Sequence, residues 1–223
     1  MSTESFELEK SDDLRSKRFA PKEVRRQQLI EATLKVIAEK GVSGTTMSAI
    51  TGTAGLSTGI VSLHFYSKDN LLKSTLEYLA IEFRDHWHEV ATDNSLSAAQ
   101  KIWGILETNF APQICTPEKI RVWYAFFGEA QYRDVYRDIV KSFDLERSDV
   151  LEELFAELGL SVDASDSLTE VLESLADGLW LNMMLYPEWV EVEGIKQHLW
   201  NLLSLHFPEH FLPQNIPSLE AAR

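Results

Sequence analysis

The fold is decided by one stretch of sequence, TMSAITGTAGLSTGIVSLHFYSK, which spans residues 46–68. Thr46 can cap a first short helix, because its hydroxyl accepts a hydrogen bond from a free N–H at the helix start. Gly55 supplies a turn, where a residue without Cβ is least costly. Ser57 can cap a second short helix that ends near His64. Two short helices joined by a glycine-containing turn predict a helix-turn-helix.

Helical patterns flank this stretch on both sides. Before it, Pro21 and Gly41 are placed to begin and end a helix, and apolar residues recur inside it at helical spacing. After it, Lys68 and Asp69 open a long amphipathic helix with the apolar stripe Leu72, Leu76, Leu79, Phe83, Trp87 and Val90. The other expected helices cover residues 47–53, 96–110, 117–130, 132–158, 166–186 and 190–206, with prolines at several of the breaks.

No alternation typical of β-strands appears, so the sequence predicts an all-α protein. Its expected parts are an N-terminal three-helix DNA-binding head that contains the helix-turn-helix and a larger C-terminal helical domain for effector binding and dimerisation. The expected boundaries are a flexible tail at 1–20, the head at 21–68, the helical domain at 69–210 and a C-terminal tail at 211–223.

Composition limits the class of protein. The 223 residues are 44% hydrophobic, enough for a buried core. No apolar run approaches the ~20 residues of a membrane span, and the charged N-terminus lacks the apolar centre of a signal peptide. The single cysteine, Cys115, fits a reducing compartment. We therefore expect a cytoplasmic protein that does not contact a membrane.

Charge divides the chain into two halves. The net charge is -14, yet residues 1–72 hold 10 Lys/Arg and 9 Asp/Glu, while the remaining 151 residues hold 11 and 26. All six tryptophans lie in the acidic second half. Screening over ~8 Å at physiological salt allows the near-neutral head to bind DNA despite the acidic half.

The second short helix has the small residues that a helix needs to enter a major groove ~12 Å wide. Hydroxyls can bond phosphates or base edges, a helix start can hold a phosphate, and a histidine and a lysine can set the register on DNA. The candidate DNA-binding residues are Thr46, Ser57, Thr58, Gly59, Ser62, His64 and Lys68. Ser57 can equally serve as a cap alone. The tail at 1–20 is either inert or a basic arm through Arg15, Lys17 and Arg18.

The same stretch resembles the tetracycline-repressor (TetR) family of bacterial regulators. That family has an Ile-Ala-x-x-Ala-Gly-Val-Ser-x-Gly core, followed by aromatic-Phe-x-x-Lys and a leucine pair. Two positions depart from the pattern, with Thr51 in place of the usual Ala and Ser62 where Tyr is frequent. The matching residues are Ile50, Ala54, Gly55, Ser57, Gly59, His64, Phe65, Lys68, Leu71 and Leu72.

Further short motifs are similar to one subgroup of that family, the choline-responsive BetI-type repressors of glycine-betaine synthesis. They are Arg25–Thr33, Asn109-Phe110, Trp123-x-Ala125-Phe126 and Asp177–Leu181. The resemblance implies a double-stranded DNA operator, repression, a small-molecule effector such as choline, and a homodimer formed through the helices at 166–186 and 190–206. A TetR-type regulator of another pathway with a different hydrophobic or cationic ligand is the alternative.

The acidic half offers groups for such an effector. Aromatic faces together with a carboxylate suit a quaternary ammonium ion, and few Lys or Arg are present to clamp an anion. Aromatic residues at helical spacing also fit ordinary core packing. The candidate effector-binding residues are Trp87, Trp103, Trp123, Tyr124, Phe127, Asp177 and Trp180.

Other chemistries have little support in the sequence. His86 and His88 are two positions apart and do not face each other on a helix, so no metal site is expected. A redox role for Cys115 is a minor alternative. No phosphate loop or nucleophile elbow occurs, and we expect no cofactor and no enzymatic activity. An all-helical enzyme with a cationic substrate and a regulator without a ligand are the competing hypotheses.

Overall fold

The computed structural model describes residues 21–129 and 132–212, and every regular element in these ranges is a helix. The all-α prediction is thus confirmed. The described chain forms two compact units that divide within one long helix, between Thr75 and Leu76. The tail predicted at 1–20 and most of the one at 211–223 lie outside the described residues.

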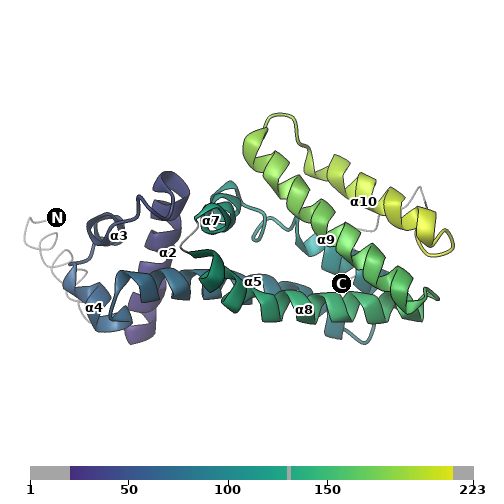
Figure 1. Ribbon diagram of the computed structural model, residues 1–223, viewed down its shortest axis with the longest axis horizontal. Coiled ribbons are helices and arrows are strands. Elements are labelled where there is room, and N and C mark those ends of the chain that lie inside the picture. Colours follow the sequence, from purple (N-terminus) through teal and green to yellow (C-terminus); the bar gives the residue numbers. More distant parts are fainter. Residues whose placement is uncertain (1–20, 130–131, 213–223) are drawn as a thin grey trace, which may run out of the picture. The chain divides into compact units, whose positions relative to one another are not determined.

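The first unit is a small helical head. It contains α2 (Lys22–Lys40), α3 (Met47–Ala54), α4 (Gly59–Phe65) and the beginning of α5 (Lys68–Thr92). Helix α2 packs against both short helices, as Figure 1 shows. The apolar face predicted for the first helix is buried, together with the inner residues of the motif, namely Ile30, Thr33, Leu34, Ile37, Ile50, Val61 and Phe65.

The two short helices form where the sequence predicts them, with one correction. The Ala49 N–H donates to the Thr46 hydroxyl at 3.2 Å, so Thr46 caps α3. Gly55 ends that helix in the left-handed conformation, with φ 66°. The second cap was predicted wrongly: α4 begins at Gly59, and the residue before it, Thr58, makes no side-chain cap bond. Ser57 instead contributes its carbonyl, which accepts from the Ile60 N–H at 3.1 Å.

The second unit continues α5 and adds five helices. These are α6 (Ala98–Thr108), α7 (Pro117–Gly128), α8 (Arg133–Glu157), α9 (Val162–Leu185) and α10 (Val192–His206). Helix α8 packs against α6, α7 and α9, and α7 also packs against α9. Figure 1 shows α8 and α9 close together near the loop that joins them and diverging at an angle from there.

Hydroxyl caps set several of these helix starts. Ser97 forms a capping box with Gln100, and the Thr116 hydroxyl accepts from the Lys119 N–H. Ser161 caps α9 by accepting from the Ala164 N–H. Because of this cap, α9 begins at Val162 instead of near residue 166 as predicted.

The apolar stripe of α10, predicted to lie in a dimer interface, packs mainly into the core of the second unit. The stripe predicted to face a second subunit consists of Ile195, Leu199, Leu202 and Leu203 on α10. Three of these residues are buried within the unit itself, and Leu202 is half-buried. Phe211, placed by sequence at the start of the C-terminal tail, is also buried and packs edge-on against Trp200, with ring centroids 5.0 Å apart. The apolar stripe of α10 therefore belongs to the core of its own subunit.

Candidate DNA-binding and effector sites

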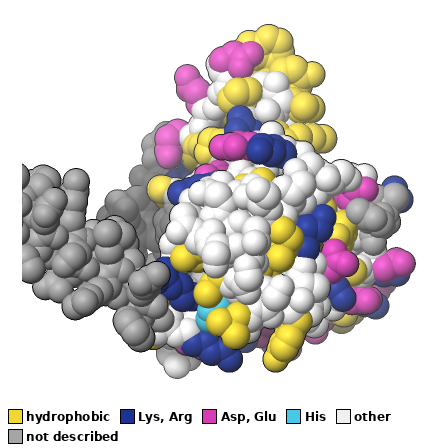
Figure 2. Space-filling model, turned by 90° about the vertical axis from the view of Figure 1, so that its left-hand side faces the viewer, with side chains coloured by type: hydrophobic (Ala, Val, Ile, Leu, Met, Phe, Trp, Pro, Cys, Tyr) yellow, Lys and Arg dark blue, Asp and Glu magenta, His cyan; other side chains and the backbone are white. Residues whose placement is uncertain are grey.

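The outer face of α4 carries small and uncharged side chains. Thr58, Gly59, Ser62 and Leu63 are exposed, whereas Val61 and Phe65 on the opposite face are buried. Figure 2 shows the face of the molecule on the left of Figure 1, which is largely neither charged nor apolar, with Lys and Arg at its margins. A helix with this exposure pattern can lie in a groove without a charge to desolvate.

Two side chains of α2 hold the ends of the helix-turn-helix. Arg26 donates from Nη1 to the His64 carbonyl and lies over the Phe65 ring, 4.2 Å from its centroid. Gln28 donates from Nε2 to the Ala54 carbonyl at 2.7 Å. These bonds satisfy carbonyls in the last turns of α4 and α3, which lack helical partners. No local sequence pattern predicts these two contacts, because only the packing of the head brings α2 to these helix ends.

The side chains of Lys68 and His64, the two candidates at the end of the motif, differ in their contacts within the head. Lys68 donates from Nζ to the Thr45 carbonyl at 3.1 Å, which fixes the start of α5 beside the start of α3. An ammonium has three N–H groups, so this bond leaves others for a phosphate. The Nδ1 atom of His64 is buried and has no hydrogen-bond partner within the described residues.

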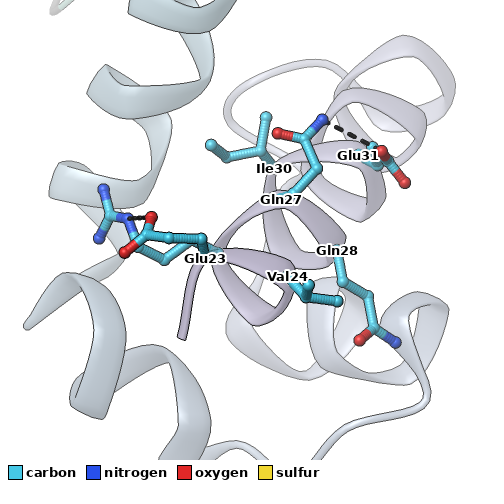
Figure 3. Close-up of a pocket in the computed structure, with 7 residues that line it drawn as sticks. Glu23, Val24, Gln27, Gln28, Ile30 and Glu31 are labelled. Carbon is cyan, nitrogen blue, oxygen red and sulfur yellow. Dashed lines mark hydrogen bonds and ion pairs between the residues drawn. The ribbon is translucent and has the colours of Figure 1, made fainter. Parts of the chain in front are cut away.

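A hollow on the head runs along α2 and is shown in Figure 3. Its polar side chains already bond one another: Gln27 donates to Glu31 at 3.1 Å, and Arg26 lies 4.0 Å from Glu23. All the lining residues belong to one helix, and acidic and basic groups are mixed. We therefore assign the candidate sites elsewhere.

In the second unit, α7, α8 and α9 bring aromatic rings and carboxylates together. The Phe127 and Tyr136 rings are 4.4 Å apart, and Tyr136 also contacts Trp123 at 5.9 Å. Tyr124 lies 5.7 Å from Phe127 and donates from its hydroxyl to the Asp177 carbonyl at 2.6 Å. We call these five residues, with Asp144 of α8, the aromatic–acidic cluster.

Asp144 and Tyr136 were not among the predicted site residues. The pKa of Asp144 is raised to about 6, mainly by burial, with the charge of Arg147 lowering it and those of Glu173 and Asp177 raising it. Burial is also the main cause of the raised pKa of Asp177. Both aspartates nevertheless remain accessible to solvent. Accessible carboxyls that protein surrounds closely are expected at the wall of a binding site.

Three cationic side chains of the second unit are already paired with glutamates. Arg147 bonds Glu173 through Nε and Nη2, both at 3.2 Å, and lies over the Phe83 ring. Arg84 pairs with Glu146, and Lys119 pairs with Glu82. Within the described part of the chain, neither Asp144 nor Asp177 has a salt bridge. The cluster therefore carries negative charge without a paired cation, at neutral pH.

Three other predicted effector residues lie apart from these contacts. Trp103 is buried against Trp200, with ring centroids 4.9 Å apart. Trp180 donates from Nε1 to the Asn109 carbonyl at 2.8 Å and meets the Phe83 ring edge-on. Trp87 is almost fully buried in α5. The structure thus brings Trp123, Tyr124, Phe127 and Asp177 together, and gives the three tryptophans contacts typical of a core.

The remaining sequence features yield no further chemistry. No group of three or more potential ligands for a metal occurs among the described residues. Burial raises the pKa of Cys115 to about 11, and its thiol lies 3.6 Å from the Met183 sulfur. This thiol therefore stays protonated and unreactive at neutral pH. None of the described helices is both long and apolar enough to cross a bilayer.

A helix-turn-helix head followed by a larger helical unit defines a DNA-binding regulator of transcription. Residues 29–75 match the model of bacterial regulatory proteins of the tetR family, and residues 98–207 match the BetI-type transcriptional repressor C-terminal domain. The chain belongs to the TetR family and is a transcriptional repressor of the BetI type, not an enzyme.

Individual relatives agree with this assignment. The HTH-type transcriptional regulator BetI of Paraburkholderia xenovorans is 30% identical over 172 residues, which cover 75% of this chain and 85% of the relative. Two crystal structures of transcriptional regulators share the fold. One, from Pseudomonas aeruginosa PAO1, has a TM-score of 0.74 at 21% identity and covers 86% of this chain and 95% of its own. The other, from Saccharomonospora viridis in complex with choline, has a TM-score of 0.65 at 22% identity and covers 81% and 95%.

Proposed function

We propose that this protein represses transcription as a homodimer and releases its operator when an organic cation binds the second unit. The proposed effector is choline or a related quaternary ammonium ion, and the proposed targets are genes of glycine-betaine synthesis. The observation that carries the proposal is the aromatic–acidic cluster, in which tightly packed rings stand beside two carboxyls without a salt bridge.

The chemistry of this cluster fits a quaternary ammonium ion better than other ligands. Such an ion cannot donate hydrogen bonds from its nitrogen, so it is recognised by aromatic faces, each worth ~0.5–2 kcal/mol, and by a nearby negative charge. An anion would meet Asp144 and Asp177, and Arg147, the arginine beside them, is already paired with Glu173. A neutral apolar ligand would leave the carboxyls without a partner, which disfavours their burial.

The choline complex of the Saccharomonospora viridis regulator supports this choice of ligand. The BetI-type match over residues 98–207 covers α6 to α10, and hence every member of the aromatic–acidic cluster. At these levels of identity, the ligand of a relative supports the ligand class for this chain. A TetR-type regulator that responds to a different hydrophobic or cationic compound remains the second candidate.

An exposed apolar face on α9 supports the homodimer. Val171, Leu175 and Leu185 are 54%, 36% and 53% exposed. With Gly178 and Asn182 they follow helical spacing along one side, while Leu168 and Leu172 turn to the core. A second copy of the same helix, crossing close at Gly178, would bury this side. A twofold pair also presents two α4 helices to DNA, as half-sites in an operator require.

The proposed response follows from linkage between two ligands. If the cation favours a conformation in which the two heads no longer match the operator, DNA affinity falls, and DNA lowers the affinity for the cation by the same factor. In each chain α5 carries the connection, since it begins in the head at Lys68 and continues into the second unit.

A titration with matched ligands tests the proposal. The full-length protein is used to select duplexes from a random pool, and binding of the enriched duplex is measured with choline and with its neutral isostere, in which a carbon replaces the nitrogen. Choline should weaken binding, and the isostere should not. A Trp103→Phe variant should respond to choline as the wild type does, because Trp103 packs in another aromatic cluster. Equal effects of the two ligands would contradict cation recognition.

A further inference from the structure

The outward ridge of α4 combines a glycine, a serine and an exposed leucine. Gly59, Ser62 and Leu63 stand at positions i, i+3 and i+4, which lie on one side of a helix. All three are exposed, and Leu63 is 70% exposed. Val61 and Phe65 fill the core from the other side, so the head does not use Leu63 for its own packing.

No steric constraint within the head requires a glycine at position 59. A Cβ built at this position meets no atom within 4 Å, and its φ is not in the left-handed region. A glycine that the fold does not require, on the exposed ridge of a helix, is typical of a site where another molecule approaches the backbone closely.

We infer that Leu63 is a specificity-determining residue that contacts the 5-methyl group of a thymine in the major groove. The inference rests on the proposed operator binding. Thymine is the base whose major-groove edge carries a methyl group, and an apolar side chain recognises it by excluding water from both. Gly59 lets the helix approach the base edges, and Ser62 supplies the neighbouring hydrogen-bonding group.

The surroundings of Leu63 favour DNA over a protein partner as its occupant. No acidic side chain lies between Gly41 and Ser67, so nothing on the motif repels phosphate. Tyr66, which is 85% exposed, follows directly after α4 with φ 67°, an unusual backbone conformation for a residue with a side chain. A narrow ridge with hydroxyls beside one leucine matches a base edge better than the broad apolar patch of a protein interface.

Replacing thymine by deoxyuridine tests this contact, because it deletes only the methyl group. In the selected duplex, each thymine is replaced in turn in both half-sites. The wild-type protein should lose affinity at one position per half-site, by about fourfold for each buried methyl group. Leu63→Ala should lose affinity for the thymine duplex and be insensitive to deoxyuridine there. Leu205→Ala, which truncates another exposed leucine, should behave like the wild type.

The possible outcomes separate this inference from the proposed function. An enriched duplex with the same deoxyuridine profile for wild type and Leu63→Ala would overturn the role of Leu63 alone. Failure to enrich any duplex, by a protein with the circular dichroism of a folded helical chain, would overturn operator binding and the inference with it. A Ser62→Ala variant that keeps the wild-type deoxyuridine profile supports the assignment of the methyl contact to Leu63.

Discussion

The hydroxyl of Tyr124 on α7 donates a 2.6 Å hydrogen bond to the backbone carbonyl of Asp177 on α9. This bond ties the aromatic wall of the cluster to the helix that carries one of its carboxyls. Burial and the charge of Asp177 raise the pKa of Tyr124 to about 12. The phenol therefore remains a donor throughout the physiological pH range.

Removing this bond should separate structural from binding effects. Tyr124→Phe keeps the ring and loses the donor, so we expect a loss of about 1 kcal/mol in unfolding free energy and little loss of choline affinity. Tyr124→Ala removes the ring and should lower choline affinity by about tenfold, within the range of one cation–π contact. Thermal unfolding and tryptophan fluorescence titration measure the two effects. Equal choline affinities for the two variants would remove Tyr124 from the site.

Choline binding should depend on pH through Asp144. Its pKa of about 6 lies above the ordinary aspartate value of 3.8, so the carboxyl is neutral below about pH 6 and charged above it. Affinity for a cation should therefore rise as the pH increases through about 6. In Asp144→Asn this rise should be reduced, leaving only the contribution of Asp177. Isothermal titration calorimetry at several pH values measures the choline affinity. An unchanged pH profile in the variant would exclude Asp144 from the binding site.

The same raised pKa predicts how stability changes without a ligand. The folded state holds the Asp144 proton more strongly than the unfolded chain, so stability is lost as the pH rises from about 4 to about 6. Asn at this position should remove that loss. Because the bound cation compensates the charge, choline should raise the melting temperature more above pH 6 than below it.

The head was largely predictable from sequence because its determinants are local. Thr46 and Gly55 act on the backbone within a few residues, and the buried face of α2 follows from spacing alone. Ser57 misled the prediction because a serine can cap the helix that begins at the next residue, and here α4 begins one residue later, at Gly59. The contacts of Arg26 and Gln28 join residues far apart in the chain, and no local pattern encodes them.

The candidate effector site was predictable only in part, for a similar reason. Trp123, Tyr124 and Phe127 share one turn of α7, so their proximity could be read from spacing. Asp144 and Tyr136 lie on α8, and their place beside α7 depends on how three helices pack. Composition could not distinguish Trp103, buried against Trp200, from the tryptophan that joins the cluster.

Arg26 should act on DNA binding by positioning α4. Arg26→Lys keeps the charge but loses the stacking on Phe65 and the directed bond to the His64 carbonyl. We expect weaker operator binding with an unchanged dependence of log K on log salt, because no phosphate contact is lost. Fluorescence anisotropy over a range of salt concentrations measures both quantities. A smaller slope in the variant would instead mean that Arg26 contacts a phosphate.

Lys68 should show the opposite behaviour. If its remaining N–H groups bind phosphate, Lys68→Met weakens binding to all duplexes alike and reduces the salt slope by about 0.9 for each contact, hence by about 2 in a dimer. Its bond to the Thr45 carbonyl is lost as well, so circular dichroism of the variant is needed to confirm an intact head. An unchanged salt slope would mean that Lys68 does not contact phosphate and only stabilises the head through its bond to the Thr45 carbonyl.

The α9 face offers the sharpest test of the homodimer. Val171→Glu and Leu175→Glu each place a charge on the exposed apolar side. Each should convert the dimer to monomers with little change in the unfolding free energy of the subunit. Val162→Glu is the matched control, since Val162 is an exposed valine of the same helix on a different side. Ile195→Ala should instead cost about 2–5 kcal/mol of stability, because this side chain is buried in its own subunit. Sedimentation velocity distinguishes the cases. If both glutamate variants remain dimers, the interface lies elsewhere. Another symmetric contact would then have to set the distance between the two α4 helices.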